Sequence, residues 1–165
     1  MTELIKSSVI FRMDENLKRI EHCFQLTDHN LLWRSANKSS NSIGHLVLHL
    51  NGNITQYIIS CLGGKKDERN RQMEFDTEEK IEKSDLLRKH VSVIHTAKDV
   101  IQSLNGEQLK KKYKVQGFEM TGIDILVHVA EHYSYHTGQI AFWMKLNLNK
   151  DLDFYKDQNL DQLNA

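Results

Sequence analysis

Apolar residues recur at helical spacing in four segments of the chain, and polar stretches separate these segments. An apolar residue at every third or fourth position indicates an amphipathic helix with one buried face. The pattern predicts helices over residues 7–26, 41–64, 84–101 and 121–146. The chain has no proline, so no residue of that kind interrupts these segments. We therefore expect an all-α protein, an up-down four-helix bundle that forms a single domain over residues 1–165.

The polar segments between the predicted helices differ in length. Residues 28–41 and 104–122 are expected to be connections, and residues 65–83, KKDERNRQMEFDTEEKIEK, a long surface loop. A loop of that length is unusual in a compact domain and often carries function. The C-terminal tail is polar, and we expect Phe154 and Tyr155 to anchor it.

Composition excludes several classes of protein. Lysine and arginine together number 22, as do aspartate and glutamate, so the chain lacks the basic excess of a nucleic-acid-binding protein. No apolar run approaches the roughly 20 residues of a membrane span, and the N-terminal segment lacks the apolar block of a signal peptide. We expect a cytoplasmic protein that binds neither nucleic acid nor membrane. Cys23 and Cys61 form no CxxC motif and are interpreted as small hydrophobic residues.

Histidines recur at every fourth position in the sequence HVAEHYSYHTGQI, residues 128–140. With about 100° between successive residues of an α-helix, His136 lies about 80° and His132 about 120° from the centre of the apolar stripe. His128 lies about 160° from that centre and is expected to face solvent or to contact the ligand residues from outside. Two histidines therefore flank the buried face, one turn apart.

The second predicted helix carries a similar arrangement. Its apolar stripe is expected to contain Leu46, Leu50, Ile54, Tyr57 and Cys61. His49 lies about 100° from the centre of that stripe, at its flank, and His45 lies about 140° away, on the outer side.

Three flank histidines from two helices can converge in one groove. His132 and His136 are spaced to chelate one cation, and His49 would complete a facial set with open positions for water or substrate. We expect these three residues to bind a divalent metal ion, with Zn²⁺, Ni²⁺, Fe²⁺ and Mn²⁺ all compatible with imidazole ligands. Asn53 and Gln139 are candidates for orienting a ligand or the substrate.

Other residues near these histidines receive no catalytic assignment. Glu131 precedes His132, whereas the general base of an HExxH motif follows its first histidine, so no general base is assigned. The remaining histidines are interpreted as surface or hydrogen-bonded core residues, namely His22, His29, His90 and His95.

The segment NSIGHLVLHLNGNITQYI, followed by HVAEHYSYHTGQI, resembles the DinB-like superfamily, also called the YfiT-like metal-dependent hydrolases. Within the superfamily the chain is most similar to a branch of proteins of unknown function, through the motifs LVLHLNGN, RNRQMEF, EHYSYHTGQI and DLDFY. The resemblance extends over residues 5–156 and rests most firmly on the paired histidines followed by TGQI.

The resemblance implies a four-helix bundle, often a homodimer, with a divalent metal held by three histidines. By matching motifs, the ligands fall on His49 in LVLHL and on His132 and His136 in EHYSYH, the residues that helical geometry selects independently. Better-known members of the superfamily are transferases and isomerases that use a low-molecular-weight thiol such as bacillithiol, mycothiol or glutathione.

Two functions from different classes follow as expectations. The first is a metal-dependent enzyme acting on a small-molecule substrate, in which the ion activates a thiol or a water as nucleophile. Thiol transfer is favoured by the resemblance, and hydrolysis is the alternative reaction. The second is a non-catalytic metal-binding or stress-related interaction protein with a degenerate site.

Overall fold

The computed structural model describes residues 2–76 and 81–163. The part of the predicted long loop that covers residues 77–80 lies outside the described residues. The long helices are α1 (Thr2–Leu26), α3 (Ile43–Ile54), α5 (Lys83–Ser103) and α7 (Gly122–Leu148). A π-helical segment, η1 (Thr55–Leu62), continues α3. The short elements are α2 (His29–Trp33), α4 (Met73–Asp76), α6 (Gly106–Lys110), β1 (Lys112–Val115) and β2 (Phe118–Thr121).

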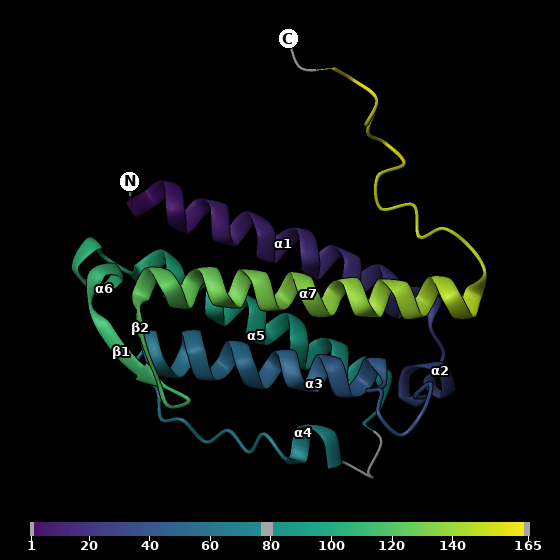
Figure 1. Cartoon of the computed structure of the whole chain (residues 1–165), viewed down its shortest axis with the longest axis horizontal. Helices are drawn as coiled ribbons and strands as arrows, with labels where there is room; N and C mark the ends of the chain where they lie inside the picture. The colour runs from purple at the N-terminus through teal and green to yellow at the C-terminus, as the bar shows by residue number, and fades with distance from the viewer. Residues whose placement is uncertain (1, 77–80, 164–165) are drawn as a thin grey trace.

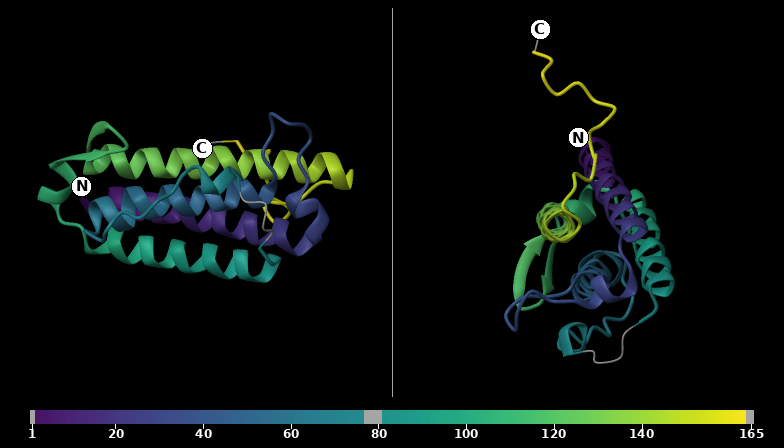
Figure 2. Two further views of the ribbon diagram at one scale, coloured as in Figure 1. Left: turned by 90° about the horizontal axis from the view of Figure 1, so that it is seen from below. Right: turned by 90° about the vertical axis from the view of Figure 1, so that its right-hand side faces the viewer.

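The long helices form a bundle in which each one packs against two others. Helix α1 contacts α5 and α7, and α3 contacts the same two helices from the opposite side. Figure 2 shows this arrangement along the bundle axis. A single apolar core lies between the helices, with Met13, Ile20, Leu50, Ile94 and Ile140 all at 0% exposure. The predicted four-helix bundle is confirmed, but its helices do not alternate in the expected up-down order, because α5 follows a long connection that reverses the chain. Helix α1 begins at Thr2, five residues before the predicted start, and the other long helices begin and end within about two residues of the prediction.

The directions of the helices follow from the long connection after η1. That connection returns along the outside of α3, so α3 and α5 run in the same direction and α1 and α7 run opposite to them (Figure 1). Two lysines fix the antiparallel pair α1 and α5. Lys6 Nζ donates to the carbonyls of Gln102 and Leu104, and Lys83 Nζ donates to those of Phe24 and Thr27.

The π-helical segment changes which residues face the core. Tyr57 is buried as predicted, but Cys61 is only half-buried, and the fully buried residue in this stretch is Ile58. A π-helix closes each hydrogen bond over i→i+5 and so holds more residues per turn than an α-helix. The 100° spacing used for the prediction therefore fails beyond Ile54.

A β-hairpin occupies the segment that the sequence indicated only as a connection. β1 and β2 pair antiparallel, with Lys112 opposite Thr121 and Val115 opposite Phe118. The turn residues Gln116 and Gly117 both have positive φ, 50° and 83°, as a tight hairpin turn of the I′ kind requires. Strands this short have too few positions for an alternating pattern to be recognised.

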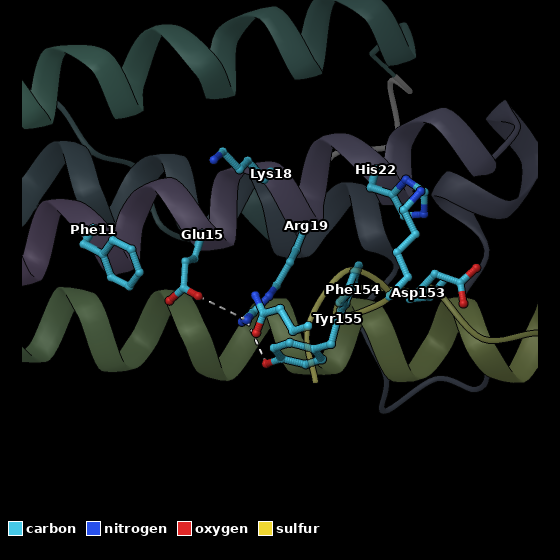
Figure 3. Close-up of a pocket in the computed structure, with 11 residues that line it drawn as sticks. Phe11, Glu15, Lys18, Arg19, His22, Asp153, Phe154 and Tyr155 are labelled. Atoms are coloured by element: carbon cyan, nitrogen blue, oxygen red, sulfur yellow. Dashed lines mark hydrogen bonds and ion pairs between the residues drawn. The ribbon is translucent and has the colours of Figure 1, made fainter. Parts of the chain in front are cut away.

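The C-terminal tail rests on α1 through its first residues. Leu152 is 1% exposed, whereas Phe154 is half-buried and Tyr155 is 45% exposed, so the buried anchor is Leu152. Arg19 Nη2 donates to Tyr155 Oη over 2.9 Å, and the guanidinium also lies near the Phe154 and Tyr155 rings. Figure 3 shows this contact beside a cavity of about 450 Å³ between the tail and α1.

The long helices of this bundle lack the apolar character of a membrane span. Among the described residues, no helix combines at least 18 residues with the apolar character that crossing would require.

His90 shows how a polar ring is accommodated in the core. It is 0% exposed, with Nδ1 at 2.7 Å from Asn51 Oδ1 and Nε2 at 2.7 Å from Tyr133 Oη. The amide oxygen can only accept, so Nδ1 donates to Asn51 and Nε2 accepts from the tyrosine hydroxyl. Both ring nitrogens are satisfied in the neutral state, as the interpretation of His90 as a core residue requires.

This buried ring makes stability depend on pH. Burial lowers the pKa of His90 from 6.5 to about 4. Between those values the unfolded chain binds a proton that the folded chain excludes, so the free energy of unfolding falls as the pH drops from 6.5. We expect His90 to contribute about 1.4 kcal/mol per pH unit to that fall. Urea unfolding across this range should give a shallower pH slope for His90→Gln than for wild type.

The matched control is His95→Gln, on the exposed side of the same helix. It should retain the wild-type slope. Equal slopes for wild type and His90→Gln would contradict the assignment.

Candidate metal centre

Helices α3 and α7 pack antiparallel and bring three histidine rings together. His49 comes from α3, and His132 and His136 come from successive turns of α7. The Nε2 atoms of His49 and His132 are 2.9 Å apart, and the ring centroids of His132 and His136 are 4.4 Å apart. One ligand nitrogen from each ring lies within 4.8 Å of the others. The predicted convergence is therefore observed, while metal binding by the three stays a prediction.

Neighbouring side chains orient two of the rings. His49 Nδ1 lies 2.8 Å from Glu74 Oε2, and His136 Nδ1 lies 2.7 Å from Gln139 Oε1. Since these oxygens can only accept, both Nδ1 atoms carry hydrogen and donate. The Nε2 atoms of His49 and His136 are then unprotonated and free to act as ligands. Gln139 thus has the orienting role expected of it.

Burial favours the neutral form of the two rings from α7. It lowers the pKa of His132 to about 3, helped by the neighbouring rings of His136, His49 and His128. Burial also lowers the pKa of His136, although the hydrogen bond with Gln139 opposes part of the effect. A metal ion requires neutral imidazole, so the protein environment disfavours the protonated forms that would compete with it.

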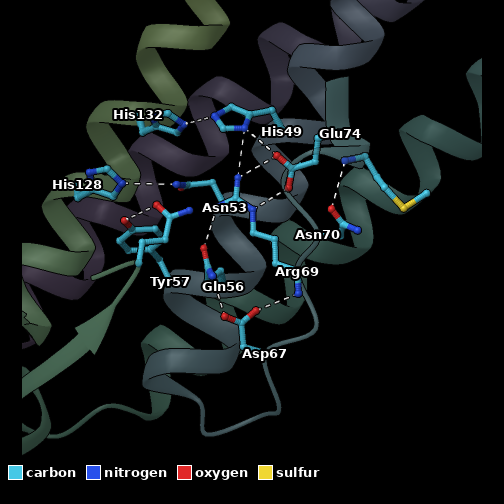
Figure 4. A network of polar contacts seen from close by, with 12 residues as sticks. His49, Asn53, Gln56, Tyr57, Asp67, Arg69, Asn70, Glu74, His128 and His132 are labelled. Atoms are coloured by element: carbon cyan, nitrogen blue, oxygen red, sulfur yellow. Dashed lines mark hydrogen bonds and ion pairs between the residues drawn. The ribbon is translucent and has the colours of Figure 1, made fainter. Parts of the chain in front are cut away.

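The long loop contributes a buried ion pair behind His49. Arg69 donates two hydrogen bonds to Glu74, from Nε to Oε1 over 2.7 Å and from Nη2 to Oε2 over 2.9 Å (Figure 4). Arg69 Nη1 donates in turn to Gln56 Oε1, whose amide group donates to Asp67. Burial alone would raise the pKa of Glu74, but the hydrogen bonds from Arg69 and His49 bring it below its usual value.

Sequence reasoning did not assign any role to Arg69 or Glu74. The signals available were the unusual length of the polar loop and the motif RNRQMEF within it. Neither signal shows which helix the loop follows.

His128 and Asn53 lie beside the cluster on the side of η1. The half-buried His128 ring stacks on His132, with centroids 5.5 Å apart, and packs near the ring of Tyr57. Asn53 Nδ2 lies 3.5 Å from His128 Nε2, and Asn53 Oδ1 is buried with no hydrogen-bond partner among the described residues. The expected position of His128, outside the first set of ligands, agrees with this geometry.

Two other expectations concern groups outside the cluster. His45 is not on an open outer face, because it is half-buried with its ring 5.4 Å from that of Trp33 in α2. Cys23 is buried, which raises the pKa of its thiol to about 12, and burial also raises that of Cys61. These cysteines therefore lack the thiolate character of a reactive residue.

The donor set suits a divalent ion of intermediate softness. Three neutral imidazoles contribute no charge and leave coordination positions for exogenous groups, which is typical of catalytic sites. Their buried, prearranged nitrogens fit such an ion, and the same ligands accept Zn²⁺, Ni²⁺, Fe²⁺ or Mn²⁺.

The chain belongs to the family described as Protein of unknown function (DUF1572), which it matches over residues 3–155. Its fold is similar to the crystal structure of a DinB-like protein from Bacillus subtilis, with a TM-score of 0.68, 18% identity, and coverage of 90% of this chain and 96% of that chain. A DinB-like protein from Bacillus cereus gives a TM-score of 0.68, 16% identity and coverage of 88% and 91%. No curated protein matches the chain. The DinB-like architecture implied by the resemblance is thus confirmed.

Gly52 makes room for the carboxylate that contacts His49. A Cβ atom at this position would lie 1.9 Å from Glu74 Oε1 and 2.9 Å from Arg69 Nε. We expect Gly52→Ala to force these groups apart and to destabilise the protein by about 1–3 kcal/mol, measured by urea unfolding.

Gly138→Ala is the control, because a Cβ on this glycine of α7 meets nothing within 4 Å. It should stabilise the protein by about 0.5–1 kcal/mol through helix propensity. An equal gain for Gly52→Ala would contradict the close packing of the loop on α3.

Proposed function

We propose that this protein is a metal-dependent enzyme with His49, His132 and His136 as ligands of a divalent ion and a small molecule as substrate. The observation that carries the proposal is the convergence of three imidazoles from α3 and α7, with ligand nitrogens within 4.8 Å of one another. Structural sites usually surround the ion with four protein ligands, whereas three leave room for chemistry. When bound, the ion would act as a Lewis acid that lowers the pKa of a thiol or water.

The residues around the cluster have separate tasks in this proposal. Glu74 and Gln139 hold His49 and His136 in the tautomers that direct Nε2 at the ion. Asn53 Oδ1, a buried acceptor with no partner among the described residues, accepts a hydrogen bond from the thiol or water and orients it. The Glu131 side chain is exposed and takes no part, in keeping with its exclusion as a general base.

Thiol transfer is the reaction we propose first, with a low-molecular-weight thiol as cosubstrate. Two points support this choice: the resemblance of the histidine motifs to the superfamily described above, and the pKa of a thiol, which is low enough for activation without a strong general base. Hydrolysis would demand deprotonation of water, and the carboxylate that contacts the cluster, Glu74, is already bound by Arg69 and His49. A homodimer and the absence of a nucleic-acid partner stay predictions.

Metal content is the first test. Protein purified without an affinity tag should contain about one equivalent of a divalent metal per chain, measured by inductively coupled plasma mass spectrometry. His132→Ala should reduce that content at least tenfold, because it removes one of three ligands. His95→Ala, an exposed histidine on α5, should keep wild-type content. Wild type without metal, and unable to take up Zn²⁺, Ni²⁺, Fe²⁺ or Mn²⁺, would refute the proposal.

Turnover separates the enzyme from the binding protein. The metal-loaded protein should consume bacillithiol, mycothiol or glutathione in the presence of an electrophile and lose that activity with His132→Ala. Hydrolysis without thiol would identify the alternative reaction. Stoichiometric metal with no turnover in either assay would favour the non-catalytic metal-binding protein.

A further inference from the structure

We propose that Glu74 and Arg69 are positioning residues that fix the tautomer and orientation of His49 before any ion arrives. The inference rests on the proposed metal site and adds to it the loop after η1, which supplies both residues. Together we call Arg69 and Glu74 the loop clamp.

The chemistry of the carboxylate decides the tautomer. Glu74 Oε2 lies 2.8 Å from His49 Nδ1 and can only accept, so the proton sits on Nδ1. The lone pair of Nε2 then faces His132, whose own Nε2 is 2.9 Å away. Arg69 Nη2 also lies 3.2 Å from His49 Nδ1. With the proton on Nδ1 both atoms are donors, so they do not bond to each other; they are close because both donate to Glu74 Oε2.

Arg69 fixes the carboxylate itself. The guanidinium side chain is 3% exposed and binds both oxygens of Glu74, which prevents the carboxylate from rotating away from His49. Gln56 and Asp67 hold Arg69 from behind, through its Nη1 atom and its backbone N–H respectively. The hydrogen bonds with Gln56 and Asp67 limit the rotation of Arg69, and the bidentate pair limits the rotation of the Glu74 carboxylate.

The packing around His49 supports a built site. Phe75, the residue after Glu74, places its ring 5.1 Å from that of His49, so α4 covers the imidazole from a second direction. Gly52 leaves the space that Glu74 Oε1 occupies against α3. An ion pair that only attached the loop to the bundle would not require a hydrogen bond to His49 Nδ1.

The tautomer of His49 in the metal-free protein tests the inference directly. Long-range ¹⁵N–¹H correlation spectra of wild type should show His49 protonated on Nδ1 alone. Glu74→Ala removes the acceptor and should give a mixture of the two tautomers. The affinity for Zn²⁺, measured by competition with a chelator, should fall about 10- to 100-fold in Glu74→Ala and by a smaller factor in Arg69→Met.

Glu68→Ala is the matched control, because Glu68 is an exposed acid of the same loop paired with Lys66. It should leave the tautomer and the affinity for Zn²⁺ within twofold of wild type. A purely structural role would lower the unfolding temperature of Glu74→Ala without changing the tautomer or the affinity, and would overturn the inference.

Wild-type His49 protonated on Nε2 would overturn it as well, whether or not the variants fold. Failure of wild type to bind metal would refute the proposed function, while the tautomer would still decide the role of the loop clamp.

Discussion

The packing of α3 against α7 places polar rings at the edge of an apolar core. Rings held there lose most of their hydration, and the loss is greater for charged imidazole than for neutral imidazole. His132 therefore remains neutral over a wide range of pH. Because the two helices run antiparallel, His49 meets the two histidines of α7, and one turn further along Asn53 meets His128. Helix pairing thus determines both the core and the composition of the candidate site.

The long loop after η1 explains why the site is better organised than the helices alone would make it. It returns along α3 and buries Arg69 and Glu74 beside His49. A buried ion pair is costly to desolvate and does little for stability unless its remaining hydrogen bonds are satisfied. Here Glu74 also accepts a hydrogen bond from His49, and Arg69 also donates one to Gln56. These hydrogen bonds offset part of the desolvation cost of the ion pair, and the pair in turn holds His49 in place.

Fold and site carry different information about function. The structural neighbours share the fold at 16–18% identity, which is too little to transfer substrates or reactions. Function has to be argued from the geometry of the site, because one fold supports several chemistries. In this protein that geometry consists of three imidazoles, two of them oriented by Glu74 and Gln139, and a buried acceptor on Asn53 that has no partner within the described part of the chain.

The sequence by itself determined the four helices and the side of each helix on which His49, His132 and His136 lie. These are local properties, since the period of an α-helix relates neighbours only a few residues apart. The departure at η1, the direction of α5, the β-hairpin and the position of the loop clamp were decided by tertiary structure. Nothing local links Glu74 to His49, because their contact depends on the path of a polar loop across α3 and on the space left by Gly52.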